Sequence, residues 1–174
     1  MIYTILKTFA TALVVTTSIY DISVPGIAGN EIRFNDYRNK KILLVNICTG
    51  GPHVNQLAEL EQLYQRYKDS LVIIAFPSNS FNNETHTNEE LASILNNTYH
   101  ISFPVASKSE VVGQNANSVY KWLSDSNENG VVSNPARADF QKYLINGQGR
   151  IIGIFRGLVS PLDSMIQKSI IDQY

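Results

Sequence analysis

The residue with the clearest chemical potential is Cys48, the single cysteine of this chain of 174 residues. It ends a mostly apolar segment, residues 41–48, and His53 follows near an expected helix start. A thiolate is a strong nucleophile, and a neighbouring imidazole can act as its base. One hypothesis is therefore a reactive thiol that forms mixed disulfides. The other, which we favour, is a small apolar core residue, because a thiol at a strand end lies short of the helix N-terminus that would acidify it.

Composition excludes several other kinds of site. A single cysteine rules out an intramolecular disulfide, a Cys-x-x-Cys redox pair and a cysteine-rich zinc site. His53, His86 and His100 are too scattered to predict a metal site, and no motif predicts a cofactor. Lys and Arg number 14 against 15 Asp and Glu, for a formal net charge of -1. Such a balance does not predict a surface that binds nucleic acid.

The segment that carries Cys48 is the first of two expected buried strands. Residues 41–48 and 71–76 are mostly apolar rather than alternating, which is typical of parallel strands covered on both faces. Between them, residues 54–69 repeat apolar side chains at steps of three and four, which predicts an amphipathic helix. Together these segments predict a strand–helix–strand unit with two parallel strands.

The remaining segments surround this unit. Alternating residues on both sides of a turn predict a hairpin over residues 20–34, and Thr87 with Glu90 forms a capping box that opens a helix. A helix, a polar surface loop, a hairpin and a final helix follow, over residues 115–122, 124–134, 140–155 and from Ser160 onward. This order predicts an α/β protein with a thioredoxin-like fold: a central mixed sheet flanked by helices, with an N-terminal β-hairpin. Residues 18–174 are expected to form one domain.

The N-terminal segment stands apart from this domain. Residues 2–20 are apolar and rich in threonine, with one charge at Lys7, and are too short for a convincing transmembrane helix. One interpretation is a signal peptide over residues 1–17, which would make the protein periplasmic or extracellular. The alternative is a helix or strand packed on the domain of a cytoplasmic protein.

From about Ser18 to Ile171 the sequence resembles the glutathione peroxidases. The blocks that carry the resemblance occur in the family's order: residues 18–22, 41–47, 59–67, 71–81, 87–90, 103–105, 112–116, 119–123 and 139–144. Ordered agreement over this many blocks is more specific than any single motif. The resemblance implies a thioredoxin-type fold and the reduction of hydroperoxides in response to oxidative stress, with a hydroperoxide and a thiol reductant as partners.

The resemblance also implies where the family's catalytic tetrad falls. The peroxidatic cysteine or selenocysteine of Val-Asn-Val-Ala-Ser-x-Cys-Gly corresponds to Gly51. In Phe-Pro-Cys-Asn-Gln-Phe, the second cysteine of many members corresponds to Ser78, and the glutamine of the tetrad to Ser80. The remaining two members, from Trp-Asn-Phe, correspond to Ala138 and Asp139. All four tetrad positions are substituted.

These substitutions favour a protein impaired in catalysis. Gly51 offers no nucleophile, while Ser80 and Ala138 shorten or remove the N–H donors that would hold a thiolate. Asp139 adds a negative charge, which raises the pKa of a nearby thiol. We therefore expect a pseudoenzyme or binding module whose protein partner the sequence does not identify. The alternative is an active thiol oxidoreductase or peroxidase whose nucleophile has moved to Cys48.

Overall fold

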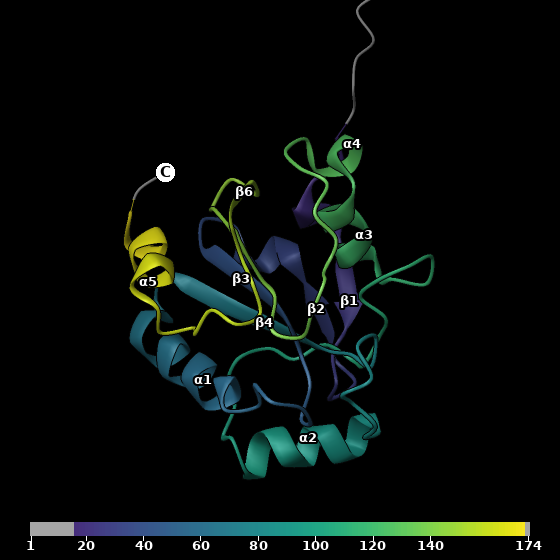
Figure 1. Ribbon diagram of the computed structural model, residues 1–174. Coiled ribbons are helices and arrows are strands. Elements are labelled where there is room, and N and C mark those ends of the chain that lie inside the picture. Colours follow the sequence, from purple (N-terminus) through teal and green to yellow (C-terminus); the bar gives the residue numbers. More distant parts are fainter. Residues whose placement is uncertain (1–15, 173–174) are drawn as a thin grey trace, which may run out of the picture.

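The computed structural model describes residues 16–172 (Figure 1). Its centre is a four-stranded sheet with the order β4-β3-β5-β6. The strands are β3 (Lys41–Ile47), β4 (Leu71–Pro77), β5 (Lys142–Ile145) and β6 (Ile151–Phe155). Strands β3 and β4 are parallel, whereas β5 is antiparallel to both β3 and β6. The expected central mixed sheet is therefore confirmed.

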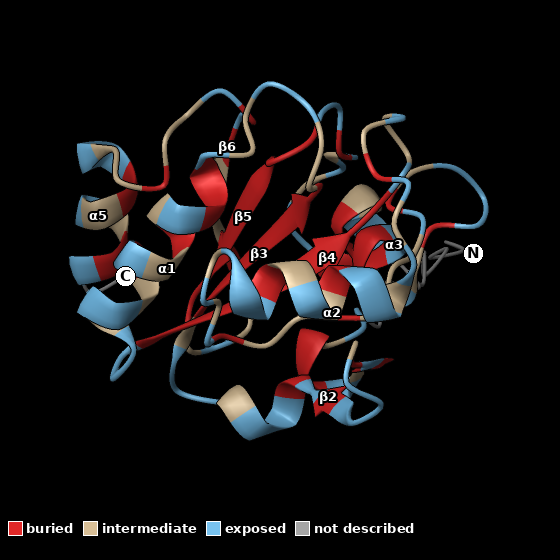
Figure 2. Ribbon diagram, turned by 90° about the horizontal axis from the view of Figure 1, so that it is seen from below, coloured by how far each residue is buried: buried red, intermediate tan, exposed pale blue. Residues whose placement is uncertain are grey.

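Both faces of the sheet are covered, which explains the continuous apolar character of β3 and β4. Leu43 and Val45 pack on one side with α1 (Gln56–Tyr67) and α5 (Ser164–Ile171). Ile42 and Leu44 pack on the other side with α3 (Ser118–Ser124) and the N-terminal hairpin. All four of these side chains are fully buried, and the central strands are red in Figure 2. Alternate residues of one strand thus enter two separate cores.

The N-terminal hairpin is also confirmed. It consists of β1 (Ser23–Pro25) and β2 (Glu31–Arg33), which pair antiparallel. Short 3₁₀ helices flank it: η1 (Ile19–Asp21) precedes β1, and η2 (Phe34–Tyr37) follows β2. Each strand buries its middle residue and exposes its two ends, so the alternation in the sequence reflects one covered face.

Helix boundaries differ from the prediction mainly at the C-terminus. Helix α2 (Asn88–Asn97) has the expected capping box: Glu90 N donates to Thr87 Oγ1 over 3.3 Å, and Thr87 N donates to Glu90 Oε2 over 2.8 Å. Helix α5 begins at Ser164 rather than just after Ser160, so that prediction is wrong. Asp163 caps this helix, because its Oδ1 accepts the N–H of Met165 over 2.8 Å.

The region expected to be a polar surface loop contains a short helix, α4 (Ser126–Asn129). Asn129 is only 8% exposed, and its Nδ2 donates to the carbonyl oxygens of Trp122 and Val132, each over 2.7 Å. A buried asparagine thus holds this segment in place by backbone contacts, although no apolar periodicity marks it. Trp122 itself is a core residue, as expected, and its Nε1 donates to Thr17 O over 2.7 Å.

The signal peptide expected over residues 1–17 lies almost entirely outside the described residues. Within residues 16–172, none of the helices has the length and apolar character needed to cross a bilayer.

Candidate functional site

Gly51, at the peroxidatic position, lies in the exposed turn between β3 and α1. Its φ of +86° belongs to the left-handed region, which L-residues with side chains rarely adopt. A Cβ built on Gly51 would lie 3.2 Å from Cγ of Asn83. The backbone of Asn83 also contacts this turn, because Asn83 O accepts a hydrogen bond from Gly50 N over 3.2 Å. The local backbone is therefore adapted to glycine.

Cys48 directly follows β3 and is only 1% exposed. Its Sγ donates to Gly50 O over 2.8 Å, which directs the thiol back into the turn. Burial raises the pKa of Cys48 to about 12, and the carboxylates of Asp139 and Glu84 contribute to the increase. The residue is therefore a protonated thiol at neutral pH. Its side chain still forms part of a cavity wall, next to Asp139.

Asp139 is the tetrad position with the most unusual environment. It is 8% exposed, its Oδ2 accepts a hydrogen bond from Asn83 Nδ2 over 2.7 Å, and its Oδ1 is buried without a hydrogen-bond partner in residues 16–172. Asn46 of β3 holds the segment around it: Asn46 Nδ2 donates to Ala138 O over 2.9 Å, and Phe140 N donates to Asn46 O over 2.8 Å. Phe140 adopts a φ of 59°, an uncommon value for a bulky residue. Strand β3 thus fixes the position of the Asp139 carboxylate.

The two serines are turned away from this centre. Ser80 Oγ donates to Glu110 Oε2 over 2.5 Å and accepts the N–H of Val111 over 3.0 Å. Ser78 is fully buried and donates to Ser80 Oγ over 3.0 Å. Neither serine lines the cavity that Cys48 and Asp139 share. The structure therefore brings Gly51 and Asp139 together at Asn83, whereas Ser80 is bound to another loop.

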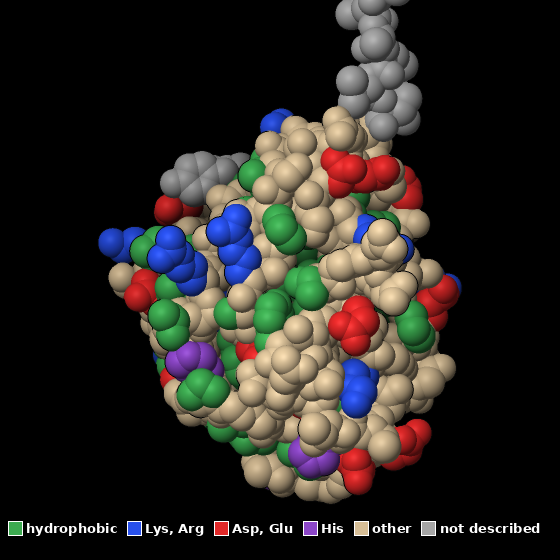
Figure 3. Space-filling model, turned by 45° about the vertical axis from the view of Figure 1, so that its right-hand side comes forward, with side chains coloured by type: hydrophobic (Ala, Val, Ile, Leu, Met, Phe, Trp, Pro, Cys, Tyr) green, Lys and Arg blue, Asp and Glu red, His purple; other side chains and the backbone are tan. Residues whose placement is uncertain are grey.

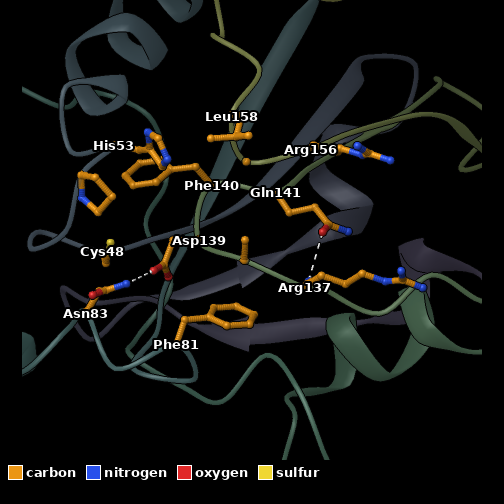
Figure 4. Close-up of a pocket in the computed structure, with 13 residues that line it drawn as sticks. Cys48, His53, Phe81, Asn83, Arg137, Asp139, Phe140, Gln141, Arg156 and Leu158 are labelled. Carbon is orange, nitrogen blue, oxygen red and sulfur yellow. Dashed lines mark hydrogen bonds between the residues drawn. The ribbon is translucent and has the colours of Figure 1, made fainter.

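The cavity at this site has a volume of about 570 Å³ (Figure 4). Its lining residues come from the turn after β3, the loop after β4, the segment just before β5 and the loop after β6: Cys48, Pro52, His53, Phe81, Asn83, Arg137, Ala138, Asp139, Phe140, Gln141, Arg156, Gly157 and Leu158. Most of its surface is apolar, and Leu158 is 75% exposed. A hollow lined by hydrophobic side chains is visible near the middle of the face in Figure 3. The size and apolar lining suit a small organic ligand.

The polar groups of the cavity are separated in space. Cys48, Asn83 and Asp139 lie together at one side in Figure 4. Arg137 and Arg156 lie at the other side, and both are exposed. His53 also lines the cavity, as a half-buried residue, but no hydrogen bond joins it to Cys48 among the described residues. The Cys48–His53 pair of the reactive-thiol hypothesis is therefore not joined by a hydrogen bond in residues 16–172.

Glu84 is a fully buried carboxylate behind the site that the sequence did not reveal. It accepts hydrogen bonds from Thr49 N over 2.6 Å, Thr49 Oγ1 over 2.8 Å, and both His86 N and His86 Nδ1 over 3.0 Å. Burial alone would raise the pKa of Glu84, but the hydrogen bonds from Thr49 and His86 outweigh it and lower the pKa. The ionised carboxylate thus ties the turn after β3 to the loop after β4.

Lys142, at the start of β5, is another fully buried ionisable residue. Its Nζ donates to Gln56 Oε1 over 2.6 Å, Val159 O over 2.7 Å and Phe140 O over 2.8 Å. Burial lowers its pKa to about 7, while the charge of Glu59 acts in the opposite direction.

No group of three His, Cys, Asp or Glu side chains within residues 16–172 is arranged to hold a metal ion.

Comparison with known proteins places this chain in a family. A thioredoxin-family thiol:disulfide interchange protein from Chlorobium tepidum superposes with a TM-score of 0.65 at 14% identity, covering 92% of this chain and 99% of that one. This likeness establishes a thioredoxin-like fold. The apo form of Trgpx superposes with a TM-score of 0.67 at 30% identity, covering 89% of this chain and 94% of that chain.

The sequence comparisons agree with this likeness. The family model described as glutathione peroxidase matches residues 19–124. Glutathione peroxidase-like peroxiredoxin 2 of Saccharomyces cerevisiae is 32% identical over 156 residues, which cover 87% of this chain and 96% of the relative. The chain belongs to the glutathione peroxidase family, a family of thiol peroxidases.

Proposed function

We propose that this chain is a glutathione-peroxidase-family protein that no longer reduces hydroperoxides and serves as a binding module. The observation that carries the proposal is the burial and raised pKa of Cys48, the only thiol at the site. Gly51 provides no nucleophile, and Cys48 is 1% exposed with a pKa of about 12. Peroxide reduction requires a thiolate that attacks one oxygen while the other leaves. A buried, protonated thiol beside a carboxylate is poorly suited to that step.

The donors that would stabilise a thiolate are also missing. Ser80 is hydrogen-bonded to Glu110 and lies outside the cavity, and Ala138 has no polar side-chain atom. Asp139 brings a negative charge to the place where the family's chemistry would generate another. The site contains a cavity with an apolar lining, so binding is the capacity that the geometry supports.

A second candidate is a peroxidase that uses Cys48. It is favoured by one observation: Cys48 lines the same cavity in which a hydroperoxide would bind. In that case the Cys48 thiolate would attack a peroxide oxygen, form a sulfenic acid and release the alcohol or water. One external thiol would then convert the sulfenic acid into a mixed disulfide with loss of water, and a second would release Cys48 and form the disulfide of the reductant. One measurement distinguishes the two functions: the consumption of hydrogen peroxide or a lipid hydroperoxide with a thiol reductant, by the native chain and by Cys48→Ser. A binding module gives no consumption with either chain, whereas a Cys48 peroxidase gives consumption that Cys48→Ser abolishes.

We also propose that residues 1–17 act as an export signal. The proposal is supported by the apolar, threonine-rich composition of this segment. Mass spectrometry of the N-terminus of protein recovered from outside the cytoplasm tests it: a chain shortened by about this segment is the expected result, and an intact N-terminus contradicts it.

A further inference from the structure

The loop after β6, residues 156–159, forms one wall of the cavity and is held by Lys142. Its first three residues line the cavity, and Figure 4 shows Leu158 at the upper side of that space. Lys142 Nζ donates to Val159 O over 2.7 Å. The same Nζ donates to Phe140 O over 2.8 Å, and Phe140 also lines the cavity. One buried amine therefore joins two segments of the cavity wall.

The third acceptor of this amine is Gln56, the first residue of α1. Gln56 Oε1 accepts from Lys142 Nζ over 2.6 Å, while its Nε2 donates to Gly157 O over 2.7 Å. If the amide turned over to donate to a neutral amine, its oxygen would face Gly157 O. Gln56 therefore either keeps both contacts or gives up its contact to the loop.

Only an ammonium group satisfies all three acceptors together. An ammonium has three N–H donors, whereas the neutral amine has two and a lone pair. Lys142 is fully buried, so solvent does not supply the missing donor. Phe140 is fixed by β3, since its N–H donates to Asn46 O over 2.8 Å, and Gln56 belongs to a helix. The loop is thus the segment that loses a contact when the amine is neutral.

The surroundings of Lys142 favour loss of its proton. Its neighbours in the sheet register are Val45 of β3 and Phe155 of β6, and both are apolar. Burial lowers the pKa of Lys142 to about 7, although the charge of Glu59 on α1 opposes this effect. The amine therefore changes its protonation state near neutral pH rather than in the alkaline range usual for lysine.

We propose that Lys142 is a proton-dependent clamp on the cavity: its ammonium form holds residues 156–159 in place as a wall, and its neutral form releases this loop. The inference rests on the proposed binding function and adds control of that site by pH. In the held state the loop lies close to Asp139, because a Cβ on Gly157 would collide with Asp139 O. Release of the loop therefore opens the wall beside Asp139. The effect is local, since deprotonation also removes a buried charge, which favours the fold as a whole.

The test follows the Leu158 methyl groups by NMR in the ligand-free native chain from about pH 5 to about pH 9. Their chemical shifts should change with one midpoint near pH 7. Trypsin should cleave after the exposed Arg156 about three- to tenfold faster above the midpoint, the change expected for one lost hydrogen bond. A small peptide substrate corrects for the activity of trypsin at each pH. Unchanged shifts and an unchanged cleavage rate over this range would overturn the inference.

Three variants identify the group that titrates. Lys142→Met has no donor and should show the released shifts and the fast cleavage at every pH. Glu59→Gln removes the charge that favours the ammonium and should move the midpoint to lower pH, which keeps the test decisive if Lys142→Met folds poorly. Lys121→Met changes an exposed lysine outside the cavity and should behave as the native chain does.

Other charged or titratable groups border the same space: Arg156 of the loop, and His53 and Asp139 in the cavity wall. Histidine also changes its charge near neutral pH, so His53→Gln is the control for the imidazole and should leave the midpoint in place. Loss of the transition in His53→Gln, its persistence in Lys142→Met, or a midpoint that Glu59→Gln does not lower would overturn the inference. Both readouts are taken without ligand, so failure of the clamp is distinguishable from failure of the proposed binding function.

Discussion

Asn83 and Asp139 form a side-chain hydrogen bond of 2.7 Å at the centre of the site. The same asparagine lies where a side chain at residue 51 would point, since a Cβ on Gly51 would be 3.2 Å from Asn83 Cγ. An amide–carboxylate pair therefore occupies the surroundings of the family's nucleophile. The site therefore differs from the family's pattern in the groups around residue 51 as well as in the residue itself.

A cysteine restored at the family position is not expected to restore activity. Gly51→Cys places a side chain on a left-handed backbone and against Asn83, so we expect the free energy of unfolding to fall by about 1–3 kcal/mol. The new thiol would still lie near Asp139 and without the displaced donor at residue 80. Chemical denaturation and a peroxidase assay measure the two effects. Gly51→Ala is the matched control and should lose similar stability; rapid turnover by Gly51→Cys would show that only the nucleophile was missing.

Cys48 should resist alkylation in the native protein. With a pKa raised from 9.0 to about 12, its thiolate population at pH 8 is lower by roughly a thousandfold than in the unfolded chain, and burial adds a steric barrier. The rate of reaction with iodoacetamide, followed by mass spectrometry, measures this. Asp139→Asn should accelerate labelling because it removes a repelling charge, while Asp69→Asn should leave the rate unchanged. Fast labelling of the native chain contradicts the assignment of Cys48 as an inert thiol.

Lys142 should make stability depend on pH in the alkaline range. Its folded pKa of about 7 lies below the ordinary value of 10.5, so between these values the unfolded chain holds a proton that the native protein has lost. Stability from this residue therefore rises as pH increases from about 7 to about 10. Comparison of the native chain with Lys142→Met, by denaturation at several pH values, isolates this slope. The exposed Lys121→Met should retain it; an identical slope in Lys142→Met would contradict the prediction.

Glu84→Gln should destabilise the fold and change its acid sensitivity. The substitution weakens the hydrogen bonds from Thr49 and His86, and we expect a loss of about 1–3 kcal/mol in the free energy of unfolding at neutral pH. Because the folded pKa of Glu84 is lowered, its stabilisation is present above pH 4.5 and is lost as pH falls through the folded pKa. The variant should therefore lose less stability on acidification than the native chain. Asp69→Asn serves as the exposed control.

Thr17 should add stability to the domain, so removal of residues 1–17 as an export signal should leave a folded but less stable chain. Thr17 O accepts the buried Trp122 indole N–H, and Thr17 N donates to Glu128 O over 2.9 Å. A chain that begins at Ser18 should therefore be less stable than one that begins at Thr16 by about 1–3 kcal/mol, because the indole N–H loses its acceptor. Thr17→Ala in the longer chain keeps the carbonyl and should lose less. Equal melting temperatures for the two chains would show that these contacts contribute nothing.

The sequence alone predicts the elements whose signals lie within a few neighbouring residues. The apolar runs of β3 and β4 and the capping box at Thr87 each carry their signal within a few residues. Helix α4 was missed because it is held by Asn129, a single buried polar residue whose contacts no periodicity reveals. The start of α5 was misplaced because Ser160 and Asp163 are both plausible caps, and only the contacts of Asp163 select it.

The site was predictable only in part, and for a physical reason. The positions of Gly51 and Asp139 came from resemblance to a family. Their common partner, Asn83, lies in a polar loop with no motif of its own. The buried Glu84 and Lys142 were missed because their partners are distant in the sequence, such as Thr49 for Glu84 and Gln56 for Lys142. Long-range polar contacts of this kind are determined by the fold rather than by local sequence.

The chain has an apolar cavity lined by two of the positions that correspond to the family's tetrad, Ala138 and Asp139, and we propose that it lacks peroxidase activity. The most direct measurement is the rate of hydroperoxide consumption by the native protein with excess thiol reductant, against Cys48→Ser under the same conditions. We predict that the two rates are equal and do not exceed the rate without protein. A native rate that is proportional to protein concentration and abolished by Cys48→Ser would contradict the account and identify Cys48 as a working nucleophile.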